Sequence, residues 1–183
     1  GLLSSEDLKN IIKICLRNAY DETSIGKDIL TNFRYINILN DIVSINSNEV
    51  FQILKAMDIF IIQFLKIGLE QTKTNLISVN IALMKLITSL YKYGEESSIF
   101  FEDFDYQFIL KNLFDCKIID PKVPFIACEC IYSVVEVKQF EGFNFFFGGE
   151  NFEYFNQLID LILDDDIEYH VKAAFYILIG ILF

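Results

Sequence analysis

The sequence of 183 residues has no tryptophan, only two prolines, eight glycines and a single histidine, His170. One histidine excludes a metal site built on several histidines, and no cysteine stands at a helpful spacing from it for a nucleophile–base pair. The glycine pair Gly148-Gly149 is followed by no Lys-Ser or Lys-Thr and preceded by no predicted strand, which excludes a phosphate-binding loop. We therefore predict that the chain is not an enzyme and that it uses no metal and no cofactor.

Basic residues are also scarce, with 15 Lys and Arg against 26 Asp and Glu and a net charge of −11. A nucleic-acid partner is disfavoured because such a field repels phosphates. The acids cluster near positions 95–105 and 164–168. They are either solvated loops and helix N-termini or an acidic surface that binds basic peptide segments of other proteins. The residues predicted for that surface are Glu95, Glu96, Glu102, Asp103 and Asp105.

The chain lacks a long uncharged apolar run. The most apolar stretch, Val50 to Leu69, is interrupted by Lys55, Asp58 and Lys66, whereas a membrane-spanning helix needs about 20 mostly uncharged residues. We therefore predict no membrane span. Residues 1–4 show neither a basic segment nor a cleavage site, so no signal peptide is predicted.

The four cysteines follow no disulfide framework, which favours an intracellular protein of the cytoplasm. Cys128 and Cys130 lie two residues apart in a predicted helix, so their side chains point about 200° apart around its axis. That geometry disfavours half of a zinc site. Buried core positions are the simpler interpretation for these thiols.

Helical periodicity dominates the sequence. From Leu8 to Ala19 the apolar residues follow the spacing of one helix face, and Ser5 is the predicted N-cap of this helix. Further helices are predicted over about 25–39 and from Asn48 to Leu69, the latter broken or capped near Gly68. No alternating strand pattern with a hairpin turn is present.

Three longer helices, predicted over 78–90, 123–135 and 170–182, share one pattern of apolar and small residues. Ala82, Ala127 and Ala174 align at offsets of 127 − 82 = 45 and 174 − 127 = 47 residues. Each long helix follows a shorter one, predicted over 58–69, 106–114 and 152–163, with Gly94 and Gly148-Gly149 as breaks. We interpret the alanines as points of close approach between stacked helices.

A period of 40–47 residues of paired helices is typical of armadillo and HEAT repeats. The predicted fold is therefore all-α, an armadillo/HEAT-like α-solenoid of about four repeats in a single domain. The repeat units would be 1–47, 48–94, 95–138 and 139–183. The alternative is an irregular, compact helical bundle.

The run from Phe140 to Phe147 is the most unusual local feature because five of its eight residues are phenylalanine. It is either a short packing helix or an exposed aromatic anchor for a partner, since aromatic residues dominate binding hot spots. Phe143, Phe145 and Phe146 are the predicted contact residues. The very apolar C-terminal helix, 170–182, could also support self-association.

The C-terminal part carries a family resemblance. It has an Asp120-Pro121-Lys122-Val123 turn that enters a long helix, then the Gly148-Gly149 break, a short helix, an acidic turn and a closing helix. This order resembles the C-terminal repeats of the importin-α (karyopherin-α) family of nuclear-import adaptors. The resemblance implies an armadillo superhelix that binds basic localisation signals and is present in the nucleus as well as the cytoplasm. Its groove residues are not carried over, since Thr88, Ser133 and Gly180 stand where that family has its tryptophan and asparagine ladders.

From the sequence we predict a non-enzymatic scaffold for protein–protein interaction. The more specific prediction is that the chain is part of an importin-α-like nuclear transport adaptor. The alternative is a compact helical regulator, of the viral Bcl-2-like type, that binds an amphipathic helix in a groove.

Overall fold

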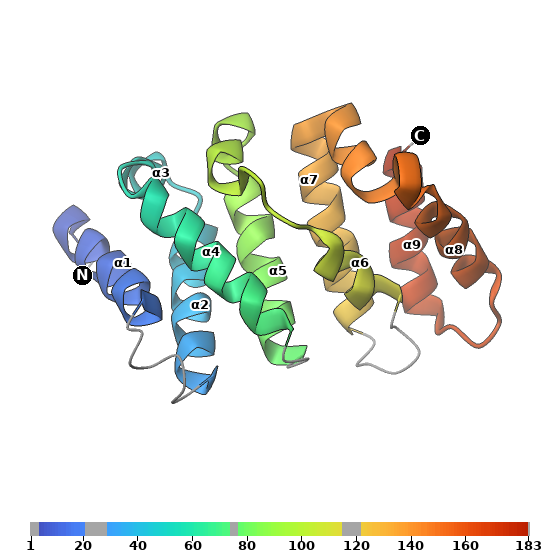
Figure 1. Cartoon of the computed structure of the whole chain (residues 1–183), viewed down its shortest axis with the longest axis horizontal. Coiled ribbons are helices and arrows are strands. Elements are labelled where there is room, and N and C mark those ends of the chain that lie inside the picture. Colours follow the sequence, from blue (N-terminus) through green and yellow to red (C-terminus); the bar gives the residue numbers. More distant parts are fainter. Residues whose placement is uncertain (1–3, 21–28, 74–76, 115–121, 183) are drawn as a thin grey trace. The chain divides into compact units, whose positions relative to one another are not determined.

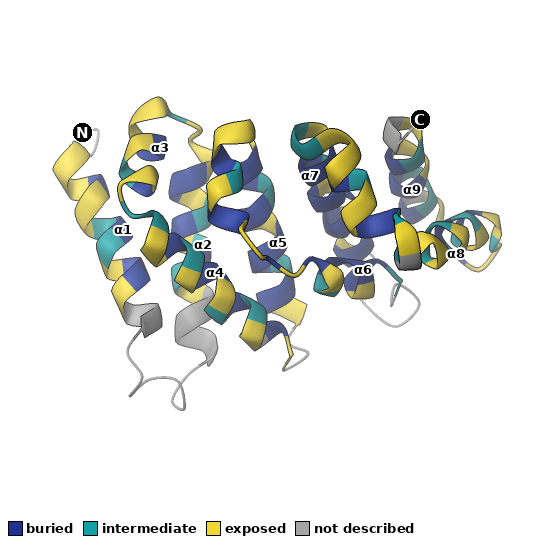
Figure 2. Ribbon diagram, turned by 45° about the horizontal axis from the view of Figure 1, so that its top comes forward, coloured by how far each residue is buried: buried dark blue, intermediate teal, exposed yellow. Residues whose placement is uncertain are grey.

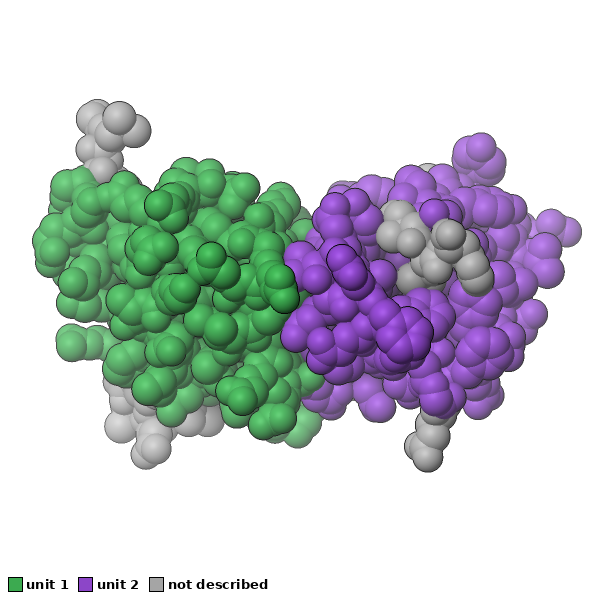
Figure 3. All heavy atoms as spheres, turned by 90° about the horizontal axis from the view of Figure 1, so that it is seen from above, with its two compact units in different colours: residues 1–104 green, residues 105–183 purple. Residues whose placement is uncertain are grey.

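The computed structural model describes residues 4–20, 29–73, 77–114 and 122–182, and every regular element in these ranges is a helix (Figure 1). The predicted all-α fold class is thereby confirmed. None of the helices in these ranges is both long and apolar enough to cross a membrane. The chain divides into two compact units, residues 1–104 and residues 105–183 (Figure 3).

The first unit contains five α-helices and one 3₁₀ helix. These are α1 (Ser5–Tyr20), α2 (Ile29–Ser44), α3 (Asn48–Lys55), α4 (Asp58–Thr72), α5 (Ile77–Tyr91) and η1 (Glu95–Phe101). Most of α5 is buried because it packs against α2, α4 and η1. Figure 2 shows these buried residues on the helix faces that turn toward neighbouring helices.

Helix α1 begins with a reciprocal cap. The Asp7 backbone N–H donates to Ser4 Oγ at 3.2 Å, while the Ser4 backbone N–H donates to Asp7 Oδ2 at 3.1 Å. Each side chain thus satisfies a backbone donor that the first helical turn leaves without a partner. The predicted cap at Ser5 was wrong by one residue, because Ser5 is already helical.

The helix predicted from Asn48 to Leu69 is two helices, α3 and α4, with a turn at Ala56 and Met57, and α4 begins at Asp58 as predicted for the shorter helix 58–69. The turn is closed by the Met57 N–H, which donates to the Leu54 carbonyl at 2.9 Å. Gly68, predicted as a break, lies inside α4. A Cβ there would stand 3.1 Å from Leu83 Cδ1, so the missing side chain allows close packing of α4 on α5.

The second unit contains α6 (Gln107–Phe114), α7 (Lys122–Phe147), the short 3₁₀ helix η2 (Gly149–Asn151), α8 (Phe152–Leu163) and α9 (Tyr169–Leu182). The predicted helices 106–114, 152–163 and 170–182 agree with α6, α8 and α9 to within one residue. Gly149, with φ 54°, provides the predicted break before α8.

Helix α7 is kinked at Gln139, whose φ of 50° and ψ of −125° are not helical. Beyond the kink, a Cβ on Gly142 would lie 2.9 Å from the Val134 carbonyl oxygen and 3.0 Å from Val135 Cα. The end of α7 therefore folds back against its own middle, and only glycine allows that approach. The predicted helix 123–135 ended before this segment.

Both units stack two helix pairs in the same order. In the first unit α1 pairs with α2 and α4 with α5, and contacts also join α1 to α4 and α2 to α5. In the second unit α6 pairs with α7 and α8 with α9, and contacts join α6 to α8 and α7 to α9. First helices thus pack on first helices and second helices on second helices.

The structure changes the proposed register between two of the long helices. Two stretches of fifteen residues, one starting at residue 78 and one at residue 122, have the same succession of buried and accessible positions. The offset is 122 − 78 = 44 residues, one less than predicted, and it places Ala82 opposite Ile126. Ala82, Ala127 and Ala174 are all buried, although Ala82 and Ala127 are not at equivalent positions.

The boundary between the units, after Phe104, falls inside the predicted repeat unit 95–138. The four-repeat division and the armadillo/HEAT type stay predictions. The predicted turn at Asp120-Pro121 lies outside the described residues.

Candidate interaction site

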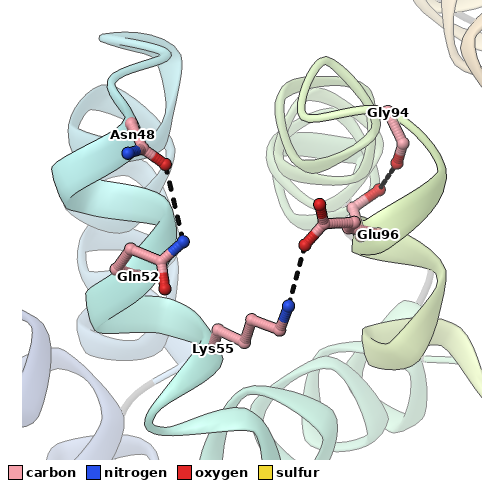
Figure 4. Close-up of polar contacts among 6 residues, drawn as sticks. Asn48, Gln52, Lys55, Gly94 and Glu96 are labelled. Atoms are coloured by element: carbon pink, nitrogen blue, oxygen red, sulfur yellow. Dashed lines mark hydrogen bonds and ion pairs between the residues drawn. The ribbon is translucent and has the colours of Figure 1, made fainter.

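Two of the predicted acidic residues stand at the start of η1. Glu95 and Glu96 are both exposed. Glu96 Oε2 accepts from Lys55 Nζ at 2.7 Å, which ties η1 to the end of α3 (Figure 4). One of the two acids therefore has a structural partner within its own unit.

The next three predicted acids do not form one group within a single unit. Glu102 and Asp103 are exposed in the turn after η1, whereas Asp105 begins the second unit. Asp105 Oδ1 accepts from the Gln107 backbone N–H at 2.9 Å, where α6 begins. This contact is a local cap, which agrees with the interpretation of these acids as loop and helix-terminus residues. Partner binding by the five acids stays a prediction.

The acidic cluster at positions 164–168 is also a capped turn. The Asp166 N–H donates to Asp164 Oδ1 at 3.0 Å, and the Ile167 N–H donates to the Asp164 carbonyl at 3.2 Å. Ile167 is buried under this turn, just before α9 begins. The aspartates therefore shape the α8–α9 connection.

The predicted aromatic anchor divides into buried and accessible residues. Phe146 is fully buried and packs edge-on against Tyr106 at 5.6 Å, so it is not available as an exposed anchor. Phe143 is half-buried and contacts Phe147 at 5.8 Å. Phe145 is 37% exposed and stacks on Tyr106 at 5.5 Å. This segment is thus mainly a packing element of the second unit.

The described thiols are core residues. Cys15 is buried, and burial raises the pKa of its thiol to about 11. Cys128 and Cys130 are buried in α7, while Cys116 lies outside the described residues, as does the side chain of His170. In the part of the chain that the structure describes, no three His, Cys, Asp or Glu side chains come together as a metal site.

An open hollow of about 350 Å³ lies between α7 and α9 of the second unit. Among the described residues that line it, Glu129 alone is charged, and the others are Phe125, Cys128, Tyr132, Ala174, Ile177 and Leu178. A cavity of about 150 Å³ already holds a benzene ring, so this hollow has room for more than one apolar side chain. An apolar concavity with few polar groups is the usual form of a binding site.

Part of the lining is accessible from outside. Phe125 is 44% exposed and Ile177 is 62% exposed. Tyr132 is half-buried and donates a hydrogen bond to Glu136 Oε1 at 2.9 Å. This hydrogen bond, with the charge of Glu136, raises the pKa of Tyr132. The tyrosine is therefore held in a defined position beside an exposed carboxylate.

The sequence did not identify this hollow, although both of its helices were predicted. The feature of the sequence that could have indicated it is the spacing of Phe125, Glu129, Tyr132 and Glu136. These residues lie at intervals of four, three and four residues on one face of α7. An unbroken apolar helix gives no indication of which face its neighbours leave open.

Comparisons with protein-family models, with curated proteins and with solved structures give no match.

Proposed function

We propose that this chain is a non-enzymatic protein-interaction module and that the hollow between α7 and α9 binds an apolar segment of another protein. The observation that carries the proposal is this hollow, with its nearly apolar lining and its accessible Phe125, Tyr132 and Ile177. Large apolar and aromatic groups around a concave site provide most of the energy in protein recognition.

The shifted pKa values of four described residues have local structural causes. A hydrogen bond from the Ser4 hydroxyl lowers the pKa of Asp7, and burial raises the pKa of Cys15 and of Tyr93. The pKa of Tyr132 rises because of Glu136. Each shift has a structural cause in a cap, in the core or in an ion–hydroxyl contact, so none requires a catalytic role.

The stacking of helix pairs supports the armadillo/HEAT type of module, because in such arrays the second helices of successive pairs line a common binding face. Here α7 and α9 are two successive second helices of the second unit. An importin-α-like transport adaptor is the narrower form of the proposal, and its support is the order of helices and breaks from residue 122 onward.

The experiment is a selection of peptides from a displayed library on the intact chain, followed by binding measurements on variants. Ala174→Leu adds a side chain at a residue that lines the hollow, and Ile177→Asn removes an apolar group from its rim. We expect the selected peptides to bind each variant at least about tenfold more weakly, a loss of about 1.4 kcal/mol.

The matched control is Ile59→Asn on α4, because Ile59 is 64% exposed and Ile177 is 62% exposed. The control should bind the selected peptides as the parent does. Peptides that bind the parent, Ala174→Leu and Ile177→Asn equally would overturn the proposal, provided that circular dichroism shows all the variants to be folded.

A further inference from the structure

Charges next to the hollow follow the same helical spacing as its apolar groups. On the open face of α7, Phe125 and Tyr132 are seven residues apart, and Glu129 and Glu136 are also seven residues apart. Apolar and acidic residues thus alternate along this face. At about 1.5 Å per residue the four residues span about 16 Å, or three helical turns.

A seven-residue repeat along a helix face is the repeat that a second, roughly aligned helix can follow turn by turn. Glu129 lines the hollow, and Glu136 is exposed one turn beyond Tyr132 while it accepts that tyrosine's hydrogen bond. A helix that inserts apolar side chains at Phe125 and Tyr132 would therefore bring its intervening residues close to these two carboxylates.

The charge of the whole unit has the same sign. Residues 105–183 contain 13 Asp and Glu and five Lys and Arg, a net charge of 5 − 13 = −8. Such a field attracts a cationic partner during its approach and repels an acidic one.

We infer that the occupant of the α7–α9 hollow is an amphipathic helix of a partner protein, with apolar and basic residues alternating on one face at intervals of four and three. Its apolar side chains enter the hollow, and its Lys or Arg side chains pair with Glu129 and Glu136. This inference rests on the proposed function and adds the chemistry of the partner to it.

The probe is a synthetic helical peptide of about 18 residues, a length of about five turns. Leucine and lysine alternate on one face at spacings of four, three, four and three residues, beginning with leucine. This is the order of Phe125, Glu129, Tyr132 and Glu136 on α7, read in the same direction. A second peptide carries glutamate in place of every lysine, and a third carries serine in place of every leucine. Binding to the intact chain is measured by fluorescence anisotropy at low and at physiological salt.

The decisive variant is the double substitution Glu129→Lys with Glu136→Lys. We expect the lysine peptide to bind the parent on the order of tenfold more tightly than the glutamate peptide at low salt, and less so as salt rises. The double variant should reverse this preference, and Ala174→Leu should weaken both peptides. The serine peptide should bind none of the proteins.

The control for net charge is Glu153→Lys with Asp160→Lys, two exposed acids on α8, which contributes no residue to the lining. It changes the total charge by the same amount and should keep the preference of the parent. A control that reverses the preference as strongly as the double variant would refute the pairing with Glu129 and Glu136.

Two outcomes separate this inference from the proposed function. If both peptides bind the parent equally and Ala174→Leu weakens both, the charge pairing is wrong but the hollow remains a binding site. If neither peptide binds the parent, the inferred helix chemistry is wrong, and the library selection decides on the hollow independently.

Discussion

The two units stack their helix pairs in the same order but differ in charge. Residues 1–104 contain 13 acidic and ten basic residues, a net charge of 10 − 13 = −3, whereas residues 105–183 have a net charge of −8. Each unit has 13 acidic residues, so most of the net negative charge belongs to the unit with the apolar hollow because that unit has fewer basic residues. Two units with the same order of helix packing can thus differ in surface charge, and function depends on such surface features more than on the fold.

The interiors of the units show two kinds of contact. In the first unit, polar hydrogen bonds join segments that are far apart in the sequence: Ser89 Oγ donates to Asn40 Oδ1 at 2.9 Å, and Tyr93 Oη donates to the Val43 carbonyl at 3.0 Å. Both units also contain aromatic clusters: Phe51 stacks on Tyr93 in the first unit, and Tyr106, Phe146 and Phe147 surround the folded-back end of α7 in the second. Directional bonds fix how α5 lies on α2, whereas ring packing fills the space beneath a kinked helix.

The largest effect should come from Phe146→Ala, which removes a fully buried ring from the aromatic cluster. We expect a loss of about 3–5 kcal/mol in the free energy of unfolding. Hydrogen exchange read by mass spectrometry should show the loss of protection mainly in residues 105–183. Phe140→Ala, at a residue that is 77% exposed, is the control and should stay within about 0.5 kcal/mol of the parent.

Equal loss of protection in both units of the Phe146→Ala protein would mean that the units unfold together. The contrast between them would then concern their surfaces only.

The second prediction separates two alanines that the sequence treated alike. Ala127 is fully buried, so Ala127→Leu should overpack its site at a cost of about 1–3 kcal/mol. Ala174 is also buried but lines the hollow, so a leucine there has space and should cost less than about 0.5 kcal/mol. Denaturant midpoints compare the two variants, with Lys85→Leu at an exposed helical position as the control.

If Ala174→Leu is as destabilised as Ala127→Leu, the hollow is not open to an added side chain. That result would also remove this variant as a blocking test for peptide binding.

The third prediction concerns the cap of α1 and should affect only the first unit. Ser4→Ala removes a side chain that accepts from the Asp7 N–H, and N-cap losses of this kind cost about 1 kcal/mol. The Ser4 hydroxyl also holds the pKa of Asp7 below its ordinary value of 3.8. The contribution of the charged carboxylate is therefore present above pH 3.8 and is lost as the pH falls through the lower, folded-state pKa.

The measurement is the unfolding midpoint of the parent and of Asp7→Asn from pH 7 down to pH 3. The difference between them should shrink below about pH 4. A constant difference over this range would show that the Asp7 charge does not stabilise the cap.

The smallest effect is expected at the ion pair of Lys55 with Glu96. Their side chains are 45% and 66% exposed, so water and salt screen the attraction. Glu96→Gln should cost at most about 0.5 kcal/mol, and less at high salt. A loss of more than about 1 kcal/mol in thermal unfolding would indicate that this contact holds η1 on the first unit more firmly than its exposure suggests.

Helix positions could be predicted well where a helix has one apolar face or a clear terminator. The spacing from Leu8 to Ala19 marked α1, and Gly94 and Gly149 marked breaks that need positive φ. The error at Ala56 and Met57 has a physical reason, since neither residue is a helix breaker that would mark a turn in the sequence.

The buried face of each helix was harder to predict than the helix itself. Phe145 and Phe146 are neighbours of the same residue type, yet the first is partly exposed and the second is fully buried because only the second points into the core. The alanine alignment was off by one residue between α5 and α7, since a match of small residues cannot by itself determine the orientation of a helix about its axis.

The sequence by itself determined that this chain is helical and acidic, because periodicity and charge are properties of residue order and composition. Only the tertiary structure decided which acids serve as caps and ion-pair partners, which phenylalanines are core, and where an apolar hollow stays open. The reason is that burial depends on neighbours brought together by folding. For α7 and α9, those neighbours leave Phe125, Tyr132 and Ile177 accessible beside Glu129.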